Sequence, residues 1–152
     1  MNFPLTLGNW HELQTDAQAI RFEVFVKEQG VPIELEIDDM DPLCMHALVR
    51  NDTGEPIATG RLLPDGYIGR MAVKKQARGQ GIGSRMLEAL IAAAENRGDK
   101  TLALNAQLQA EAFYARFGFV REGGQFDDAG IPHVHMKRRM MDARSVATRE
   151  SK

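Results

Sequence analysis

The residues that decide the fold are residues 69–97, which read GRMAVKKQARGQGIGSRMLEALIAAAENR. A short apolar run at residues 71–73 predicts a strand, and a basic, glycine-dense turn follows at residues 78–84. The remainder predicts a helix, because apolar side chains recur at the spacing of one helix face as far as Ala94. Gly98 stands where a glycine commonly ends a helix.

A strand, a glycine turn and a helix start together form an arrangement suited to phosphate. The first N–H groups of a helix have no intrahelical acceptor, and the helix dipole adds partial positive charge. Two common phosphate loops are excluded, because no lysine follows Gly83 and because Gly79, Gly81 and Gly83 are spaced GxGxG rather than GxGxxG. The turn therefore predicts a phosphate-bearing ligand. The alternative is a solvated turn that only starts a helix.

Size and charge narrow the class of protein. A chain of 152 residues predicts one domain, and a net charge of −2 points to neither nucleic acid nor membrane. No apolar segment is long enough to cross a bilayer, and the N-terminus lacks a secretory signal pattern. The single cysteine, Cys44, fits a reducing, cytoplasmic location. We expect a domain over residues 1–139 and a polar, flexible tail over residues 140–152.

The rest of the pattern predicts an α+β fold. Residues 5–10 read as a strand, and a helix is expected from Thr15 to about Gln29. Three alternating runs separated by turn residues predict antiparallel strands. The crossover helix predicts that the strands at residues 71–73 and 101–106 are parallel neighbours. The expected order is β-α-β-β-β-α-β-α-β-β, with the later elements at residues 45–50, 57–63, 67–73, 84–97, 101–106, 109–117, 119–126 and 133–139.

Four segments resemble the GNAT superfamily of acyl-CoA N-acyltransferases. RGQGIG at residues 78–83 fits the Q/R-x-x-G-x-G/A signature, and FYARFGF at residues 113–119 resembles the FYxxxGF segment. EVFVKEQGVP at residues 23–32 and GIPHVHM at residues 130–136 are similar to the ElaA/YjcF-type branch. The resemblance implies a mixed, mostly antiparallel central sheet flanked by helices.

The resemblance also implies that acetyl-CoA is the acyl donor. The family's asparagine position is occupied by Gln107, and Asn105 lies two residues earlier, so either amide is a candidate cofactor contact. The pantetheine arm would pair with the backbone of Met71, Ala72 and Val73, and the diphosphate would lie on Arg78, Gly79, Gln80, Gly81, Ile82, Gly83 and Ser84.

Acetyl transfer to an amine needs a group that protonates the departing thiolate. The resemblance assigns this role to Tyr114, because a phenol is neutral near pH 7 and can donate. The alternative is an ordinary aromatic residue on a helix face, beside Phe113 and Phe117.

The general base and the acceptor site are left more open. Glu36 and His135 are taken as catalytic with Tyr114. No metal is expected, because His133 and His135 have no third ligand spaced nearby. The acidic residues from Glu34 to Asp41 are interpreted either as a wall that attracts a cationic amine or as a solvated loop. Candidates that line the acceptor site, any of which could be the base, are Glu28, Glu36, Asp38, His133 and His135.

Two functions follow from these features. The first is an N-acetyltransferase that moves an acetyl group from acetyl-CoA to a primary amine of a small molecule, by direct transfer in a ternary complex. The second is a non-catalytic acyl-CoA-binding regulatory module, which would need neither Tyr114 nor the acidic stretch. Their presence favours the enzyme. The resemblance is compatible with a homodimer, because many relatives are dimers.

Overall fold

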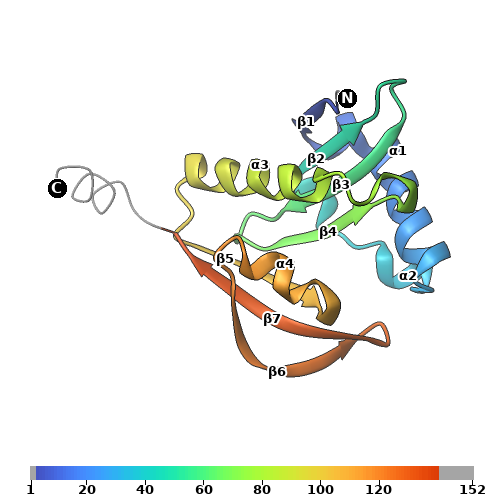
Figure 1. Cartoon of the computed structure of the whole chain (residues 1–152). Coiled ribbons are helices and arrows are strands. Elements are labelled where there is room, and N and C mark those ends of the chain that lie inside the picture. Colours follow the sequence, from blue (N-terminus) through green and yellow to red (C-terminus); the bar gives the residue numbers. More distant parts are fainter. Residues whose placement is uncertain (1–2, 141–152) are drawn as a thin grey trace. The chain divides into compact units, whose positions relative to one another are not determined.

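The computed structural model describes residues 3–140 (Figure 1). These residues form two compact units. The first contains residues 3–64 and 68–90, and the second contains residues 65–67 and 91–140. Within residues 3–140, no helix combines the length and apolar character needed to cross a bilayer.

The first unit is built on a four-stranded antiparallel sheet. Its strands are hydrogen-bonded in the order β1-β2-β3-β4. Leu48 lies opposite Thr59, and Thr59 lies opposite Ala72, so the three side chains share one face of the sheet. The three consecutive antiparallel strands predicted from the alternating runs are confirmed. The bounds are β1 Leu5–Gly8, β2 Met45–Arg50, β3 Pro56–Leu62 and β4 Ile68–Val73.

Helix α1 (Trp10–Arg21) starts earlier than the sequence analysis predicted. A capping box explains the difference: the Asn9 side chain accepts from the Glu12 N–H at 2.9 Å, and the Glu12 carboxylate accepts from the Asn9 N–H at 3.0 Å. The prediction of a start at Thr15 is therefore wrong, and so is a first strand that reaches Trp10. The helix continues as a π-helical segment, η1 (Phe22–Glu28).

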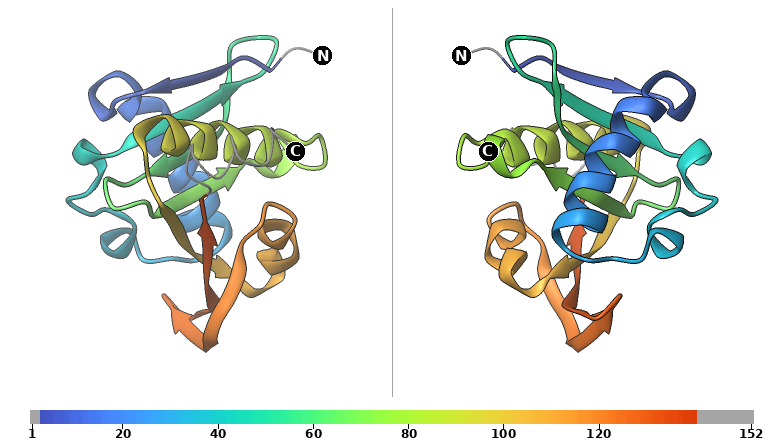
Figure 2. Two further views of the ribbon diagram at one scale, coloured as in Figure 1. Left: turned by 90° about the vertical axis from the view of Figure 1, so that its left-hand side faces the viewer. Right: turned by 90° about the vertical axis from the view of Figure 1, so that its right-hand side faces the viewer.

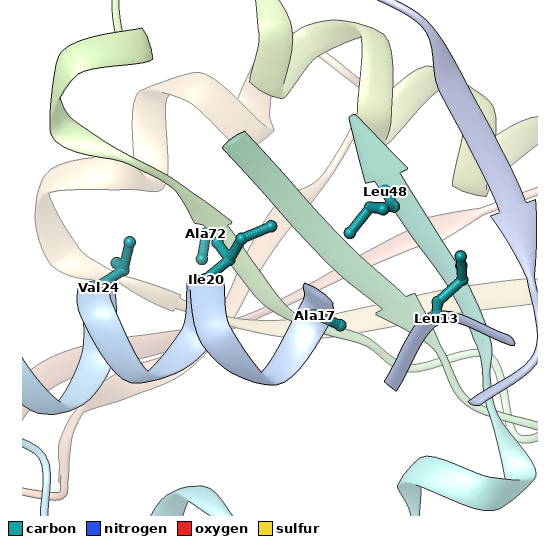
Figure 3. Close-up of a cluster of buried hydrophobic side chains, with 6 residues drawn as sticks. All are labelled: Leu13, Ala17, Ile20, Val24, Leu48 and Ala72. Atoms are coloured by element: carbon teal, nitrogen blue, oxygen red, sulfur yellow. The ribbon is translucent and has the colours of Figure 1, made fainter. Parts of the chain in front are cut away.

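The core of the first unit lies between α1 and the sheet. Figure 3 shows apolar side chains from both sides of this layer, and all of them are buried. On the other face, Gly60 leaves room for the Met71 side chain, and a Cβ at Gly60 would lie 3.3 Å from the Leu90 Cδ1. Leu90 belongs to α3 (Ile82–Arg97). The two opposite views in Figure 2 show α1 crossing one face of the sheet. The cluster comprises Leu13, Ala17, Ile20, Val24, Leu48 and Ala72.

The second unit contains a three-stranded antiparallel sheet in the order β5-β7-β6. Its strands are β5 Thr101–Gln107, β6 Val120–Asp128 and β7 Ile131–Arg139, and between β5 and β6 lie η4 (Leu108–Ala110) and α4 (Glu111–Ala115). Ala129 and Gly130 join β6 to β7 with φ values of 52° and 77°, as a two-residue hairpin turn requires. Its buried apolar residues include Ile91, Ala94, Leu102, Leu104, Phe119, Val134 and Met136.

These elements confirm the predicted α+β class and element order, with short helical turns added. The strands belong to two hydrogen-bonded sheets, and neither sheet contains a ladder between residues 71–73 and 101–106. Among the described residues, parallel pairing is limited to one bridge, between Tyr67 and Ala103, where the Ala103 N–H donates to the Gly66 carbonyl at 3.1 Å. Met140, the first residue of the predicted tail, is buried, and its N–H donates to the Lys100 carbonyl at 2.8 Å. The rest of that tail, residues 141–152, lies outside the described residues.

Candidate functional site

The glycine turn between β4 and α3 has the backbone geometry of an anion site. Gly79 and Gly81 have φ values of 81° and 77°, where an L side chain is strained, although a Cβ at either would meet nothing within 4 Å. Glycine is therefore required by conformation and not by space. The first turn of α3 includes a hydrogen bond from the Arg85 N–H to the Gly81 carbonyl at 3.2 Å. The preceding N–H groups, those of Ile82, Gly83 and Ser84, have no intrahelical acceptor.

The start of α3 is firmly anchored. The side chains of Ile82, Met86 and Leu87 are almost fully buried, with Ile82 2% exposed. Arg85 also donates to the Phe3 carbonyl at 2.6 Å. The N–H groups at the helix start are thus held in place before any ligand arrives, which reduces the ordering cost of binding an anion.

Arg78, predicted to meet the diphosphate, is paired with Glu28, predicted to line the acceptor site. Both Nη atoms donate to the Glu28 carboxylate at 2.7 Å, and Nε donates to the Val73 carbonyl at 2.9 Å. The hydrogen bonds from Arg78 lower the pKa of Glu28, so the carboxylate is ionised at neutral pH. The sequence analysis assigned these two residues to different ligands and did not foresee their contact.

Strand β4 lies at one end of its sheet, next to β3. The predicted pantetheine contacts, Met71, Ala72 and Val73, are on this terminal strand. One edge of a terminal strand has backbone N–H and C=O groups that its own sheet does not pair. An amide-bearing ligand can add to such an edge by main-chain hydrogen bonds.

The acidic stretch is tied to the sheet by arginines. Asp41 accepts from Arg21 at 2.8 and 3.1 Å and from Arg61 at 2.8 Å. Asp38 accepts from Arg61 at 2.9 and 2.6 Å, and Arg21 also pairs with Glu36. Short helical turns, α2 (Ile33–Glu36) and η2 (Asp41–Leu43), carry most of these carboxylates.

Burial overturns the solvated-loop interpretation for part of this stretch. Glu36 and Asp41 are only 7% and 4% exposed. Burial would raise the pKa of Asp41, but hydrogen bonds and charge from Arg21 and then Arg61 bring it below its usual range. A hydrogen bond from Arg61 is the main reason that the pKa of Asp38 is lowered to about 2. Asp38 and Asp41 are therefore ionised, and all three carboxylates already have cationic partners within the chain.

The predicted roles of Glu36 and Asp38 in the acceptor site remain predictions. Any such role has to be compatible with the arginines that already bind these two carboxylates. Sequence reasoning missed Arg21, Arg61 and Arg70 altogether. Arg21 lies on α1 and Arg61 on β3, and each is 15 to 23 positions away from the carboxylates it binds. The sequence did offer one signal of this network. Arg21 stands among apolar residues, and an arginine that is buried among them needs an acidic partner.

In the second unit, Asn105 and His135 form a cross-strand pair. They are direct neighbours in the β5–β7 register, and Asn105 Oδ1 lies 2.9 Å from His135 Nδ1. When a neutral imidazole donates to the amide oxygen, the proton is on Nδ1 and the lone pair is on Nε2. The Tyr67 ring lies 5.9 Å from the His135 ring. Nε2 can therefore act as a proton acceptor.

The neighbouring register position pairs Gln107 with His133. Gln107 Oε1 accepts from Gln109 at 2.6 Å, and His133 Nδ1 lies 2.7 Å from the Ile131 carbonyl. His133 is buried and stacked on Phe126. Within residues 3–140, no group of three His, Cys, Asp or Glu side chains is arranged to hold a metal ion.

Tyr114 lies on α4 among aromatic neighbours. Its ring meets Phe113 at 5.1 Å and Phe119 at 6.1 Å, both edge-on. Burial raises the pKa of Tyr114 to about 12, so the phenol keeps its proton at neutral pH. Such a phenol can donate to an anion formed beside it.

Cys44 is not in an environment that would make it a nucleophile. It is buried, burial raises the pKa of its thiol to about 11, and Sγ donates to the Met40 carbonyl at 3.1 Å. A thiol in this state does not supply the thiolate that an acyl-enzyme intermediate on cysteine would need.

The model of the acetyltransferase (GNAT) domain matches residues 14–140 of the chain. The chain belongs to the GNAT acetyltransferase family. A Bacillus subtilis relative, named "Uncharacterized N-acetyltransferase YjcF", is 43% identical over 125 residues, which cover 80% of this chain and 89% of the relative. The family and its ElaA/YjcF-type branch, predicted from four short segments, are thus confirmed.

Solved structures of GNAT relatives agree. An acyl-CoA N-acyltransferase from Pseudomonas aeruginosa is 33% identical, with a TM-score of 0.81 over 90% of this chain and 99% of that one. Escherichia coli ElaA is 27% identical, with a TM-score of 0.82 and the same coverage. This GNAT chain is an acyl-CoA-dependent N-acetyltransferase by family and fold.

Proposed function

We propose that this GNAT chain transfers the acetyl group of acetyl-CoA to a primary amine of a small molecule, directly in a ternary complex. The observation that carries the proposal is the turn before α3. There, Gly79 and Gly81 adopt left-handed backbone conformations, and the helix start has N–H groups without intrahelical acceptors. This backbone supports an anionic ligand, which we take to be the diphosphate of acetyl-CoA.

The donor is assigned to the first unit's turn and terminal strand. The diphosphate lies on residues 78–84, and the pantetheine arm pairs with the backbone of Met71, Ala72 and Val73. An amide from Asn105 or Gln107 adds a contact to the cofactor. Support comes from the anchored start of α3 and from the position of β4 at one end of its sheet.

The chemistry needs one group that accepts a proton and one that donates it. The amine nitrogen attacks the thioester carbonyl carbon, the C–S bond breaks, and the amine proton passes to a base. Tyr114 donates its proton to the departing CoA thiolate, and backbone N–H groups of residues 71–73 stabilise the oxyanion. We assign the base to His135 rather than Glu36, because Nδ1 faces the Asn105 amide and leaves Nε2 as the nitrogen that can accept, whereas the Glu36 carboxylate is buried against Arg21.

The test has two stages. Isothermal titration of CoA into the purified chain should give saturable heat, and Arg78→Ala should weaken it while Arg121→Ala, which loses a similar ion pair elsewhere, should not. Thiol release from acetyl-CoA is then measured across a panel of small amines, with the acetylated product identified by mass spectrometry. Absence of CoA binding contradicts the proposal. Binding without acetylation of any amine supports the non-catalytic acyl-CoA-binding module.

Location and assembly complete the proposal. We place the reaction in the cytoplasm, where acetyl-CoA and a reduced Cys44 are expected to coexist. The acceptor is a small molecule, with neither nucleic acid nor membrane as partner. A homodimer is compatible with this mechanism, and no step requires a second copy.

A further inference from the structure

Arg70 has an unusual backbone conformation at an irregular place in β4. Its φ is 51°, in the left-handed region that strains a non-glycine residue. The β3–β4 register shifts here: Arg61 pairs with Gly69 and Thr59 pairs with Ala72, so Gly60 alone faces Arg70 and Met71. This is a β-bulge, and it directly precedes the strand residues assigned to the pantetheine arm.

The Arg70 side chain reaches the acidic stretch. Its Nη2 donates to the Glu36 carbonyl at 3.1 Å, to the Asp38 carboxylate at 3.2 Å and to the Leu35 carbonyl at 3.4 Å. Its Nε donates to the Glu36 carbonyl at 3.3 Å. Leu35 and Glu36 are the last residues of α2, whose final carbonyls have no intrahelical donor. One guanidinium thus binds the end of α2 and the first carboxylate after it.

Strand β3 also contributes a side chain that binds Asp38. Asp38 also accepts two hydrogen bonds from Arg61, whose ladder partner is Gly69, the residue before Arg70. Arg21 and Arg61 are almost fully buried, whereas the Arg70 side chain is 28% exposed. Removing a buried partner would leave an uncompensated charge and disturb the fold, so Arg70 is the member of this network that can be changed with least damage.

We propose that Arg70 is a positioning residue for acetyl transfer, which fixes residues 35–38 against the bulge of β4. The inference rests on the proposed function, because it takes residues 35–38 as part of the acceptor site and residues 71–73 as the acyl-CoA strand. Arg70 touches neither substrate. Its guanidinium sets the place of the acceptor segment, and its left-handed backbone sets the place of the cofactor strand.

Two substitutions separate these contributions. Arg70→Gly removes the guanidinium but adopts the left-handed conformation without strain, whereas Arg70→Ala removes the guanidinium and keeps the strain. For Arg70→Gly we expect KM for the amine to rise about tenfold, from the loss of hydrogen bonds with a charged donor, with kcat changed less and CoA affinity unchanged. For Arg70→Ala we expect the same rise in KM together with weaker CoA binding.

A structural measurement accompanies the kinetics. The Ile37 N–H donates to Ile33 and the Met40 N–H donates to Asp38 at 3.0 Å, so hydrogen exchange at these amides reports whether the segment is held. Exchange there should become faster in Arg70→Gly and should recover only in part in Arg70→Lys, whose single ammonium cannot reach all the acceptors. Arg50→Ala is the matched control, since Arg50 in the same sheet pairs with Asp16 away from this segment.

The outcomes distinguish the inference from the proposed function. A wild-type chain that acetylates no amine overturns the proposed function. Wild-type amine KM and wild-type exchange at Ile37 and Met40 in Arg70→Gly overturn the positioning role. So does a loss of CoA affinity in Arg70→Gly as large as the rise in amine KM, because Arg70 would then act on the cofactor.

Discussion

Arg78 and Glu28 are 50 positions apart in the chain and share a two-point ion pair, with both Nη–Oε distances at 2.7 Å. We assign the Arg78 guanidinium to the diphosphate. The Glu28 carboxylate and the ligand therefore compete for the same N–H donors. CoA binding therefore includes the cost of releasing Glu28. This cost is modest, because exposed ion pairs contribute little to stability.

Replacing Glu28 by glutamine should therefore strengthen CoA binding, by about threefold for an exposed pair. Titration calorimetry at low and physiological salt measures the effect, which should shrink as salt screens the pair. Glu111→Gln is the control, because Glu111 forms a comparable pair with Arg121 in the other unit. Weaker CoA binding in Glu28→Gln would show instead that Glu28 orients Arg78 for the ligand.

Gly81→Ala should weaken CoA binding by about tenfold, because an alanine at a φ of 77° costs about 1–2 kcal/mol and the turn relaxes away from the binding geometry. Gly124→Ala provides the comparison, since a Cβ there also meets nothing within 4 Å and its φ is not in the left-handed region. Equal CoA affinity in the two variants would remove the turn from the proposed site.

Tyr114→Phe should lower kcat by about 10²- to 10⁴-fold, the usual effect of losing a general acid, while CoA affinity stays unchanged. Because burial raises the pKa of Tyr114 to about 12, the phenol stays protonated through neutral and moderately alkaline pH. The ratio of wild-type to variant rate should therefore be constant from about pH 6 to pH 9. Phe117→Leu controls for aromatic packing, because Phe117 lies in the turn after α4 and its ring meets Phe113. Wild-type turnover in Tyr114→Phe would refute the assignment.

Asn105→Asp tests His135 as the base. A carboxylate at this position would stabilise the protonated imidazole, which is the inactive form of a base. The acidic limb of the kcat/KM profile should consequently move to higher pH, and Asn105→Leu should lower the rate without that movement. The measurement is a pH–rate profile with the best amine of the panel. An unchanged acidic limb in Asn105→Asp would assign the base to another residue.

Acid should destabilise the first unit through Asp38. Its pKa is about 2 in the folded chain, against an ordinary value of 3.8, so its stabilising contribution is fully present above that ordinary value and is lost as the pH falls toward 2. Urea unfolding of the wild type at neutral and acidic pH should show this loss. Asp38→Asn should show less of it, and the exposed neighbour variant Asp39→Asn should behave like the wild type.

Local sequence features predicted much of this fold. Asn51 in the turn after β2 accepts from the N–H groups of Thr53 and Glu55, as expected of an asparagine between two alternating strands. Gly98, with a φ of 89°, ends α3 where the pattern placed the stop. In each case, residues close in the chain determine the structure, so their pattern is readable without knowledge of the partner elements.

Contacts between distant residues were not predictable in the same way. The wrong start of α1 is a different case, because the capping box at Asn9 and Glu12 is a local signal that would have placed the start correctly. The pairing of Arg21 with Asp41 depends instead on how α1 packs on the sheet. The bulge at Arg70 depends on Gly60 in another strand, and the contact of Asn105 with His135 depends on strand register.

The shared carboxylate of Asp41 has an evolutionary and practical consequence. Because it serves Arg21 and Arg61 together, a single exchange at any of the three positions leaves charge behind in a nearly dry interior. Related chains should therefore replace these residues in concert. Engineering for thermal tolerance should likewise change these arginines only together with every carboxylate that they bind, Glu36 and Asp38 included.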